Sequence, residues 1–428
     1  MMRMFKDHKV SVSQLLAFIP EPYLEQLSLQ NKVDRYAKVL HGRKLFYLLL
    51  YGMLENQRLS QRSLEDTFND PLFKQLFHLE AGESVRRSSI SERLSKIDAH
   101  YFSQIYECIY EQYASLYSAR ERQEHLLIRV DSTLVRDTAG KLQSSIGHRS
   151  GSKAVKYTMA FDGVLPCSGQ AFSQSSYNSE EVALPQLVWQ HVRQEKGHEN
   201  LYVLDRGLQG GRTLEAFDEQ HVHFVCRLKE KRKYELRANL LEPGQTRDLG
   251  EGVLLSDQLV RLYCGDRIHN RKGKIHYRES QLEQDFRLLI VESKQDPKQH
   301  YWLLTNALQL PAEEVAKAYR RRWDIEVFFR FLKQELHLSH LVSLNENGIR
   351  VMLYMTLIVA MLLLIYKHAN GIGYKTAKRR FAMEVRNLAI AILVAACGGD
   401  PDKLFKTYRS GRNFFRPLLE KILTFSFV

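Results

Sequence analysis

The chain has 428 residues, of which 44% are hydrophobic and 11% aromatic, and this composition excludes a disordered or low-complexity protein. Its 62 Lys and Arg residues exceed its 49 Asp and Glu residues, and the resulting net charge of +13 favours a polyanionic partner, most simply nucleic acid. The five cysteines are scattered and never form a CxxC pair, which excludes a disulfide framework or a zinc ribbon and favours a reducing cytoplasm.

Residues 1–120 are predicted to be helical, and their N-terminus lacks an apolar core of signal-peptide length. Leu45–Leu54 reads as a buried helix. The shorter segments SLEDTFNDPLFKQLF and SSISERLSKID each open on a serine that suits a helix N-cap. Short helices between polar turns fit a helix-turn-helix-like DNA-binding domain, and they fit a small helical bundle with another purpose equally well.

The pattern changes to strands near residue 125. HLLIRVDSTLVRDTAG contains a strand that is predicted to end at Asp131, followed by a second short strand. One or two more strands, a helix over EEVALPQLVWQHVRQEKG, a strand ending at Asp205 and the strand HVHFVCRLK follow. This order predicts a mixed sheet with helices packed on it, in which catalytic groups collect after strand ends.

Residues from about 228 to 300 are strand-like and polar, and they are predicted to form a β insertion before the next helix. We therefore expect a helical domain over 1–120, an α/β domain over 121–370 and a helical, basic C-terminal region over 371–428.

The segment YRRRWDIEVFFRFLKQEL has no Gly or Pro and is predicted to form one helix. At 100° per residue, Tyr319, Arg322, Glu326 and Lys333 fall on one narrow stripe beside an apolar face. A solvated charged face would give the same pattern, so the helix alone does not decide its role.

Asp131, Asp205 and Glu326 together suggest a metal site, although each aspartate alone could be a turn or cap residue. Mg²⁺ prefers oxygen ligands and keeps positions open for phosphate and water. A pair of such ions activates a water or a 3′-hydroxyl and stabilises the leaving oxygen of an in-line displacement.

The spacing Tyr319, two residues, Arg322, three residues, Glu326, six residues, Lys333 resembles the signature of the insertion-sequence 4 family of DDE transposases. The motifs VDST at Asp131, LDRG at Asp205 and WLLTN at Trp302 agree with it. The resemblance covers about residues 125–370. It implies an RNase H-like mixed-sheet core with a β-strand insertion, flanked by helical N- and C-terminal regions.

The resemblance also implies roles for individual residues. Asp131, Asp205 and Glu326 would bind two Mg²⁺ or Mn²⁺ ions, with no nucleotide cofactor. Arg322 and Lys333 would grip DNA phosphates, Tyr319 would hydrogen-bond a phosphate, and Trp302 would stack on a base flipped from the DNA. For Trp302, a core position in a strand is the alternative.

The implied function is cut-and-paste DNA transposition, in which strands are cleaved and joined at the terminal inverted repeats of an insertion sequence. The partners would be double-stranded DNA, at the element ends and at the target, and a second copy of the chain in a homodimer. No membrane is expected, and the location would be the cytoplasm in association with the nucleoid.

Several alternatives stay open. The chain would also fit a catalytically inactive or repurposed DNA-binding protein, or an RNase H-like nuclease without strand transfer. A membrane protein built on the apolar runs 351–366 and 388–397 is less favoured, because the longer run of about 16 residues falls short of the roughly 20 that span a bilayer. His221, His223 and Cys226 give only a weak zinc pattern without a fourth ligand. GHRSGSK lacks the Walker spacing and better fits a basic hairpin on a DNA backbone.

Overall fold

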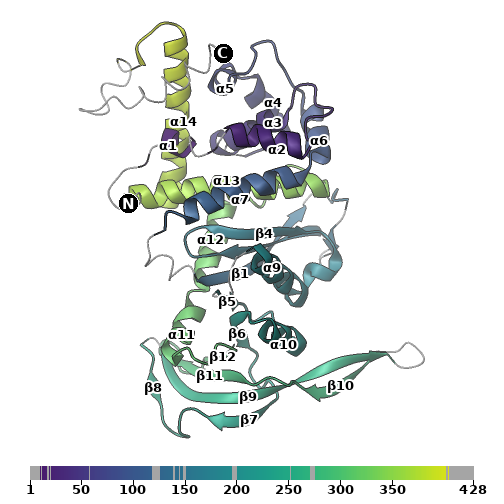
Figure 1. Ribbon diagram of the computed structural model, residues 1–428, viewed down its shortest axis with the longest axis vertical. Coiled ribbons are helices and arrows are strands. Elements are labelled where there is room, and N and C mark those ends of the chain that lie inside the picture. Colours follow the sequence, from purple (N-terminus) through teal and green to yellow (C-terminus); the bar gives the residue numbers. More distant parts are fainter. Residues whose placement is uncertain are drawn as a thin grey trace. The chain divides into compact units, whose positions relative to one another are not determined.

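The computed structural model describes residues 10–403 except 11, 17, 18, 20, 57, 118–125, 138, 139, 144, 148–150, 195–199, 251, 270–274 and 402. The chain forms two compact units, a helical unit and a sheet unit (Figure 1). The helical unit comprises residues 1–116, 141–143 and 331–428, and the sheet unit comprises 117–140 and 144–330. The basic C-terminal segment from 404 lies outside the described residues, as do residues 148–150 of the GHRSGSK run.

The helical unit contains the helices predicted near both ends of the chain. They are α1 (Val12–Leu16), α2 (Glu21–Gln30), α3 (Gly42–Glu55), α4 (Gln61–Asn69), α5 (Pro71–Leu76), α6 (Arg87–Lys96), α7 (Ala99–Ala114), α13 (Glu346–Asn370) and α14 (Tyr374–Ala396). The serine predicted to cap α4 was Ser63, but the N-cap is Ser60, and Ser63 completes a capping box three residues later.

Helix α13 is the core of this unit and packs against α7, α6 and α3. It begins at the N-cap Asn345, whose side chain accepts from two backbone N–H groups, and it ends at Gly371 in the left-handed conformation. It is the one described helix that is long and apolar enough to cross a membrane, yet 89% of its most apolar window is buried inside the protein. Such burial is typical of a core helix, and it weakens the membrane alternative.

The sheet unit is built on one mixed sheet. Its strands are β1 (Leu127–Asp137), β2 (Ile146–Gly147), β3 (Lys153–Phe161), β4 (Pro166–Phe172), β5 (Leu201–Leu204), β6 (His223–Leu228), β7 (Tyr234–Asn239), β8 (Arg247–Asp248), β9 (Gly252–His269), β10 (Ile275–Gln281), β11 (Phe286–Ser293) and β12 (His300–Thr305). The helical elements are η1 (Ser175–Asn178), α9 (Glu180–Gln194), α10 (Gly211–Glu219), α11 (Ala312–Arg320) and α12 (Trp323–Glu335), the last of which continues into the helical unit.

The strand order is β10-β9-β11-β12-β6-β5-β1-β3-β2, with β4 on β3 and with β7 and β8 on β9. Strands β1, β5 and β6 are parallel, and the other pairs are antiparallel. This arrangement confirms the predicted mixed α/β sheet of RNase H-like type with a β insertion. The insertion is not a separate layer, because β12 pairs with both β6 and β11 and joins it to the core sheet.

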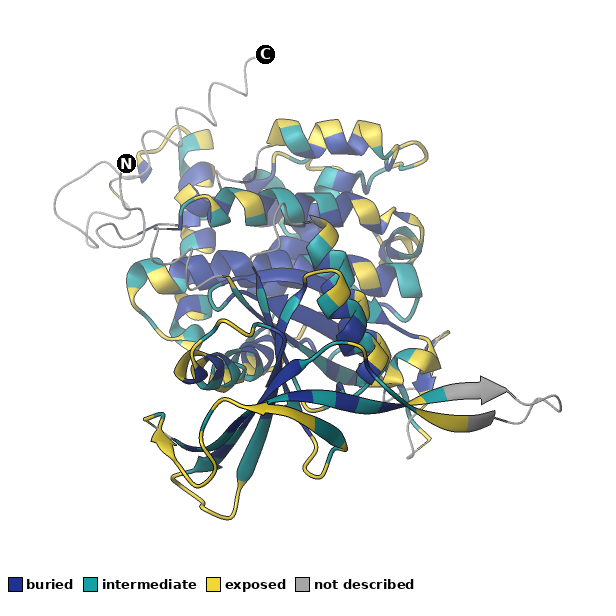
Figure 2. Cartoon of the chain, turned by 60° about the horizontal axis from the view of Figure 1, so that its bottom comes forward, coloured by how far each residue is buried: buried dark blue, intermediate teal, exposed yellow. Residues whose placement is uncertain are grey.

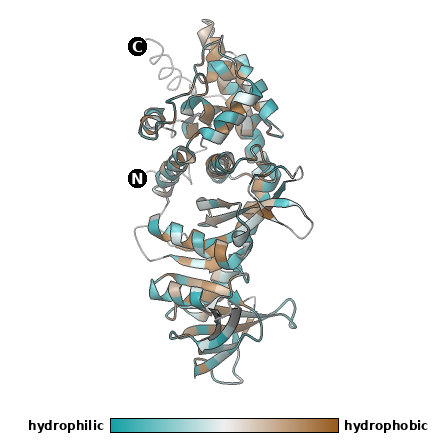
Figure 3. Cartoon of the chain, turned by 90° about the vertical axis from the view of Figure 1, so that its right-hand side faces the viewer, coloured by the Kyte–Doolittle hydropathy of each residue, from teal (hydrophilic) through white to brown (hydrophobic). Residues whose placement is uncertain are grey.

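Burial differs along this sheet. The central strands are buried, whereas β7 and β8 are largely exposed (Figure 2). In the two-stranded arm formed by β9 and β10, residues 252–264 of β9 are buried or half-buried, and residues 277–279 of β10 are exposed. The helices have a hydrophobic and a hydrophilic side (Figure 3). Under α11, the hydrophobic side meets an apolar cluster that includes Val203, Val225, Leu289 and Leu303.

Three local predictions were wrong. Strand β1 does not end at Asp131, because Ser132 and Thr133 stay paired with Thr158 and Tyr157 of β3. The predicted helix around Arg322 is broken into α11 and α12, with Arg321 and Arg322 in a turn between them. His221 precedes β6 with a φ of 54°, so it does not share a strand face with His223.

Candidate active site

The sheet register brings two aspartates together. The parallel pairing of β1 with β5 runs from Leu127↔Leu201 to Val130↔Leu204. Asp131 and Asp205 are the next residues after this last pair, one on each chain segment, so they lie next to each other at the carboxyl end of the paired stretch. Strand β1 continues past this point, but in register Asp131 corresponds to Asp205, the first residue after β5.

Arg322 connects these aspartates to the glutamate of α12. Its Nη1 lies 3.5 Å from Asp131 Oδ2 and its Nε lies 3.8 Å from Asp205 Oδ1. Its Nη2 donates a hydrogen bond to Glu326 Oε1, one helical turn further on. Carboxylates from β1, from the loop after β5 and from α12 therefore surround one guanidinium.

Buried Arg129 fixes the start of α12 on the sheet. Its side chain is fully buried, with Nη2 3.0 Å from Asp324 Oδ2, Nη1 donating to Asp162 O at 2.8 Å and Nε donating to Arg321 O at 3.3 Å. The Arg321 carbonyl also accepts from the backbone N–H of Asp324 at 3.1 Å, so Arg129 contacts both ends of the turn between α11 and α12. Since Arg129 is two residues before Asp131 on β1, one strand orients both Asp131 and the helix that carries Glu326.

Two glutamates at the start of α9 support the aspartates. Glu180 accepts hydrogen bonds of 2.8 Å from Ser132 Oγ and from Nζ of buried Lys156. Glu181 accepts hydrogen bonds from the backbone N–H groups of Gln209 and Gly210 in the loop after Asp205. Neither glutamate is among the site residues predicted above, although the pair of acidic residues that opens the predicted helix is a local signal in the sequence.

The glycine of the LDRG motif allows this close packing. A Cβ at Gly207 would lie 2.6 Å from Glu180 Cγ, and one at Gly210 would lie 2.7 Å from Glu181 Oε2. Neither glycine has a positive φ, so space rather than backbone conformation requires them. The loop that carries Asp205 is thereby held against α9.

The carboxylates are incompletely compensated. Burial raises the pKa of Asp131 to about 7, with further increases from Asp205 and Glu180, while the Ser132 N–H and Arg322 act in the opposite direction. Burial lowers the pKa of Arg322, but Asp205, Glu326 and Tyr319 together raise it above its ordinary value. One guanidinium thus faces more negative charge than it balances.

This donor set suits a hard divalent cation. It consists of carboxylate oxygens alone, which Mg²⁺ and Mn²⁺ prefer, and it has surplus negative charge. Among the residues that the structure describes, however, no three His, Cys, Asp or Glu side chains form a ready metal cluster. Arg322 lies between the carboxylates, so a shared metal ion requires its guanidinium to move aside.

The other predicted residues lie outside this cluster of three carboxylates. Tyr319, on α11, packs on the apolar cluster of the sheet unit, and burial raises its pKa to about 12. Trp302 is partly exposed on β12, where its ring meets the edge of Tyr234 with centroids 6.0 Å apart. Lys333 is exposed near the end of α12, in the part that belongs to the helical unit.

Comparisons with known proteins agree with the character of this site. The family model described as "Transposase DDE domain" matches residues 122–362, which include all three carboxylates. A putative transposase, y4zB, of Sinorhizobium fredii is 39% identical over 173 residues, 40% of this chain and 44% of that protein.

Two further relatives are described as transposases of insertion sequences. The putative transposase for insertion sequence element IS4SA of Synechocystis sp. is 25% identical over 291 residues, 66% of this chain and 72% of that protein. Transposase InsG for insertion sequence element IS4 of Escherichia coli is 26% identical over 172 residues, 40% of this chain and 34% of that protein. The match therefore spans less than half the length of y4zB and of InsG.

Proposed function

Because the chain belongs to the family of transposase DDE domains, we propose that it is a transposase that cleaves DNA strands at the terminal inverted repeats of an insertion sequence and transfers them to target DNA. One observation carries the proposal: Asp131, Asp205 and Glu326 come from three separate elements and converge on Arg322. One arginine does not need three carboxylates to form a structural ion pair. A phosphoryl-transfer site, by contrast, uses several carboxylates to bind its metal cations.

In this proposal, Asp131, Asp205 and Glu326 hold Mg²⁺ or Mn²⁺, in a pair of ions by analogy with two-metal sites. The bound metal would activate the attacking water or 3′-hydroxyl and stabilise the leaving oxygen. Glu180, Ser132 and Glu181 keep the two aspartates in place. The Arg322 side chain would move away from the carboxylates, and its guanidinium would bind a DNA phosphate, for which its planar arrangement of N–H donors is suited.

The remaining DNA contacts are proposed for residues of α12, α11 and β12. Exposed Lys333 would bind a phosphate, and the Tyr319 hydroxyl would donate a hydrogen bond to a phosphate. The Trp302 ring would stack on an unpaired base. The net charge of +13 supports double-stranded DNA as partner. A homodimer that joins both element ends, in the nucleoid-associated cytoplasm, belongs to the same proposal.

The first test compares wild type with Glu326→Gln on DNA that carries the terminal repeats of the flanking element, with Mg²⁺, with Mn²⁺ and with EDTA. Wild type is expected to cut at the repeat ends only with metal, and Glu326→Gln to lose at least about a hundredfold in rate while it still binds DNA. Glu314→Gln is the matched control, because Glu314 is exposed on α11 and, within the part of the chain that the structure describes, pairs only with Lys317.

Strand transfer is measured separately, by joining of precut repeat ends to a plasmid. Cutting without joining would indicate a nuclease. Equal DNA binding by both proteins, with no metal-dependent cutting by either, would refute the transposase proposal and leave a DNA-binding protein.

A further inference from the structure

A second polar site lies at the inner end of the β9–β10 arm. It is a cleft of about 500 Å³ between the arm and the turn 229–233 that joins β6 to β7. Its walls carry four cationic side chains from this turn against only two carboxylates, Glu230 and Glu279. A cleft of this charge suits a polyanion.

The four cations have different tasks. Lys233 pairs with Glu279 at 2.6 Å, and Arg232 donates to the Tyr263 carbonyl at 3.0 Å, so both hold the wall together. Lys229 and Lys231 are exposed, and neither has a carboxylate at ion-pair distance among the described residues. These two lysines are available to a ligand.

Lys231 is held in a conformation that favours glycine. Its φ is 65°, in the left-handed region that residues with a Cβ rarely adopt. A lysine at this position keeps a positive charge at the cleft although its backbone conformation is unfavourable for a residue with a Cβ. Glycine would remove that charge without disturbing the turn.

An aromatic ring borders the cations. Tyr277 of β10 lines the cleft and is 74% exposed. Cationic grooves with accessible aromatic rings are typical of sites for unpaired nucleic-acid strands, because the bases of a duplex are stacked on each other and not free to stack on a side chain.

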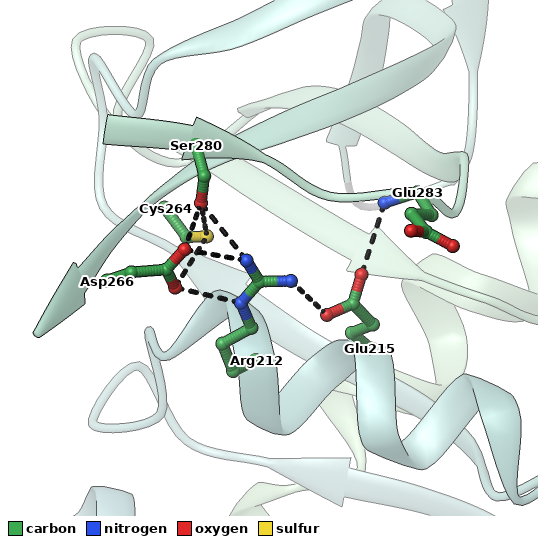
Figure 4. Close-up of polar contacts among 6 residues, drawn as sticks. All are labelled: Arg212, Glu215, Cys264, Asp266, Ser280 and Glu283. Carbon is green, nitrogen blue, oxygen red and sulfur yellow. Dashed lines mark hydrogen bonds and ion pairs between the residues drawn. The ribbon is translucent and has the colours of Figure 1, made fainter. Parts of the chain in front are cut away.

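A polar network holds the arm in place beside this cleft (Figure 4). Arg212 of α10 binds both carboxylate oxygens of Asp266 at 2.9 and 2.7 Å, and it also contacts Ser280 and Glu215. A Cβ at Gly211 would lie 2.9 Å from Cys264 Cβ, so α10 packs directly on β9. The arm wall of the cleft is therefore fixed to the core of the sheet unit.

Gln209 connects the cleft to the loop that carries Asp205. Its Nε2 donates to Arg227 O at 3.0 Å, and its Oε1 accepts from the backbone N–H of Lys229 at 3.0 Å. Its own N–H donates to Glu181, which supports the aspartate loop. Gln209 thus forms hydrogen bonds both to the turn 229–233 and to the glutamate that supports the loop of Asp205.

We propose that this cleft binds an unpaired DNA strand, with backbone phosphates on Lys229 and Lys231 and a base against Tyr277. The proposal rests on the proposed function in so far as that function makes DNA the polyanion. It adds a binding site that uses none of the three carboxylates.

The test measures binding of a fluorescent ten-nucleotide oligo-dT to the full chain by anisotropy, in EDTA, across a salt series. We expect the double variant Lys229→Gln/Lys231→Gly to bind about tenfold more weakly, with a salt slope smaller by about 1.4, since about 0.7 counterions are released per phosphate contact of a single strand. Tyr277→Ser is expected to lose at least about fivefold with the salt slope unchanged.

The control is Lys294→Gln/Lys298→Gln, which removes the same charge from exposed positions between β11 and β12 of the same unit, where Lys294 pairs with Asp248 at 2.7 Å. It should stay within about twofold of wild type, and circular dichroism checks that every variant is folded. Equal losses for both lysine pairs, no binding by wild type, or losses seen only with a blunt duplex would overturn the proposal. Because EDTA removes metal, this result is independent of cleavage, so failure of the transposase proposal is recognised separately.

Discussion

Two arginines of the sheet unit, Arg322 and Arg212, each lie among carboxylates, but the pKa of a neighbouring aspartate is raised in one case and lowered in the other. Arg212 is about half exposed and saturated with partners, and its hydrogen bond lowers the pKa of Asp266 well below the usual range. Arg322 is largely buried among three carboxylates, and the pKa of Asp131 is nevertheless raised to about 7. Burial is the largest cause of the raised pKa of Asp131, and the neighbouring Asp205 and Glu180 add to it, whereas exposed Asp266 is dominated by its hydrogen bond from Arg212. A carboxylate whose pKa is raised by burial and by like charge is a candidate functional group.

The largest expected effect comes from removing Arg322, and removal of Arg212 is the comparison. Arg322→Met should lower the free energy of unfolding by up to about 3 kcal/mol in EDTA, because three partly buried carboxylates lose their counterion. Mn²⁺ should recover much of this loss, since the metal then has no competitor among the carboxylates. Arg212→Met should be insensitive to Mn²⁺. Thermal unfolding with and without metal measures both, and a metal response of equal size in the two variants would contradict the comparison.

The second prediction concerns pH. Folded Asp131 keeps its proton up to about pH 7, whereas the unfolded chain releases it near pH 4. The metal-free protein should therefore lose stability as pH rises from 4 to 7, by roughly 1.4 kcal/mol per unit of pKa difference at most. Asp266 has the opposite sign, because the stability that it contributes is lost as pH falls below about 4.

Urea unfolding in EDTA between pH 4 and pH 8 tests this prediction. Asp131→Asn should flatten the curve between pH 4 and 7, and Asp266→Asn should leave that range unchanged. An unchanged slope in Asp131→Asn would show that this carboxylate is ionised in the folded protein.

The third prediction uses the crowded glycine of the aspartate loop. Gly207→Ala places a methyl group against Glu180, shifts the loop that carries Asp205 and should reduce metal-dependent cleavage about tenfold. Gly82→Ala is the control, because nothing lies within 4 Å of its added Cβ and its φ is not positive. Equal cleavage rates for both variants would mean that the loop position does not limit the reaction.

The smallest effect is expected at the exposed network of the arm. Asp266→Asn should change the thermal midpoint less than any variant above, and the remaining difference from wild type should shrink in 1 M salt, because ions screen exposed charges. Differential scanning calorimetry at low and high salt measures it. A large, salt-independent loss would show that this pair is a structural core rather than a surface clamp.

The sequence by itself determined the element types of the α/β core, the β insertion and the three candidate carboxylates. Periodicity and turn residues are local signals, so strands such as Leu201–Leu204 and the Pro-containing helix Glu180–Gln194 could be recognised directly. The spacing of Tyr319, Arg322, Glu326 and Lys333 is likewise a local feature, although their roles stay a prediction.

Only the tertiary structure decided the break between α11 and α12, the continuation of β1 past Asp131 and the support of the aspartates by Glu180 and Glu181. Each involves a contact with a partner distant in the sequence: the Arg321 carbonyl with Arg129, β1 with β3, and Glu180 with Ser132 and Lys156. Such contacts form only when the strands of the sheet have assembled, and they override the local propensities on which predictions from a single sequence depend.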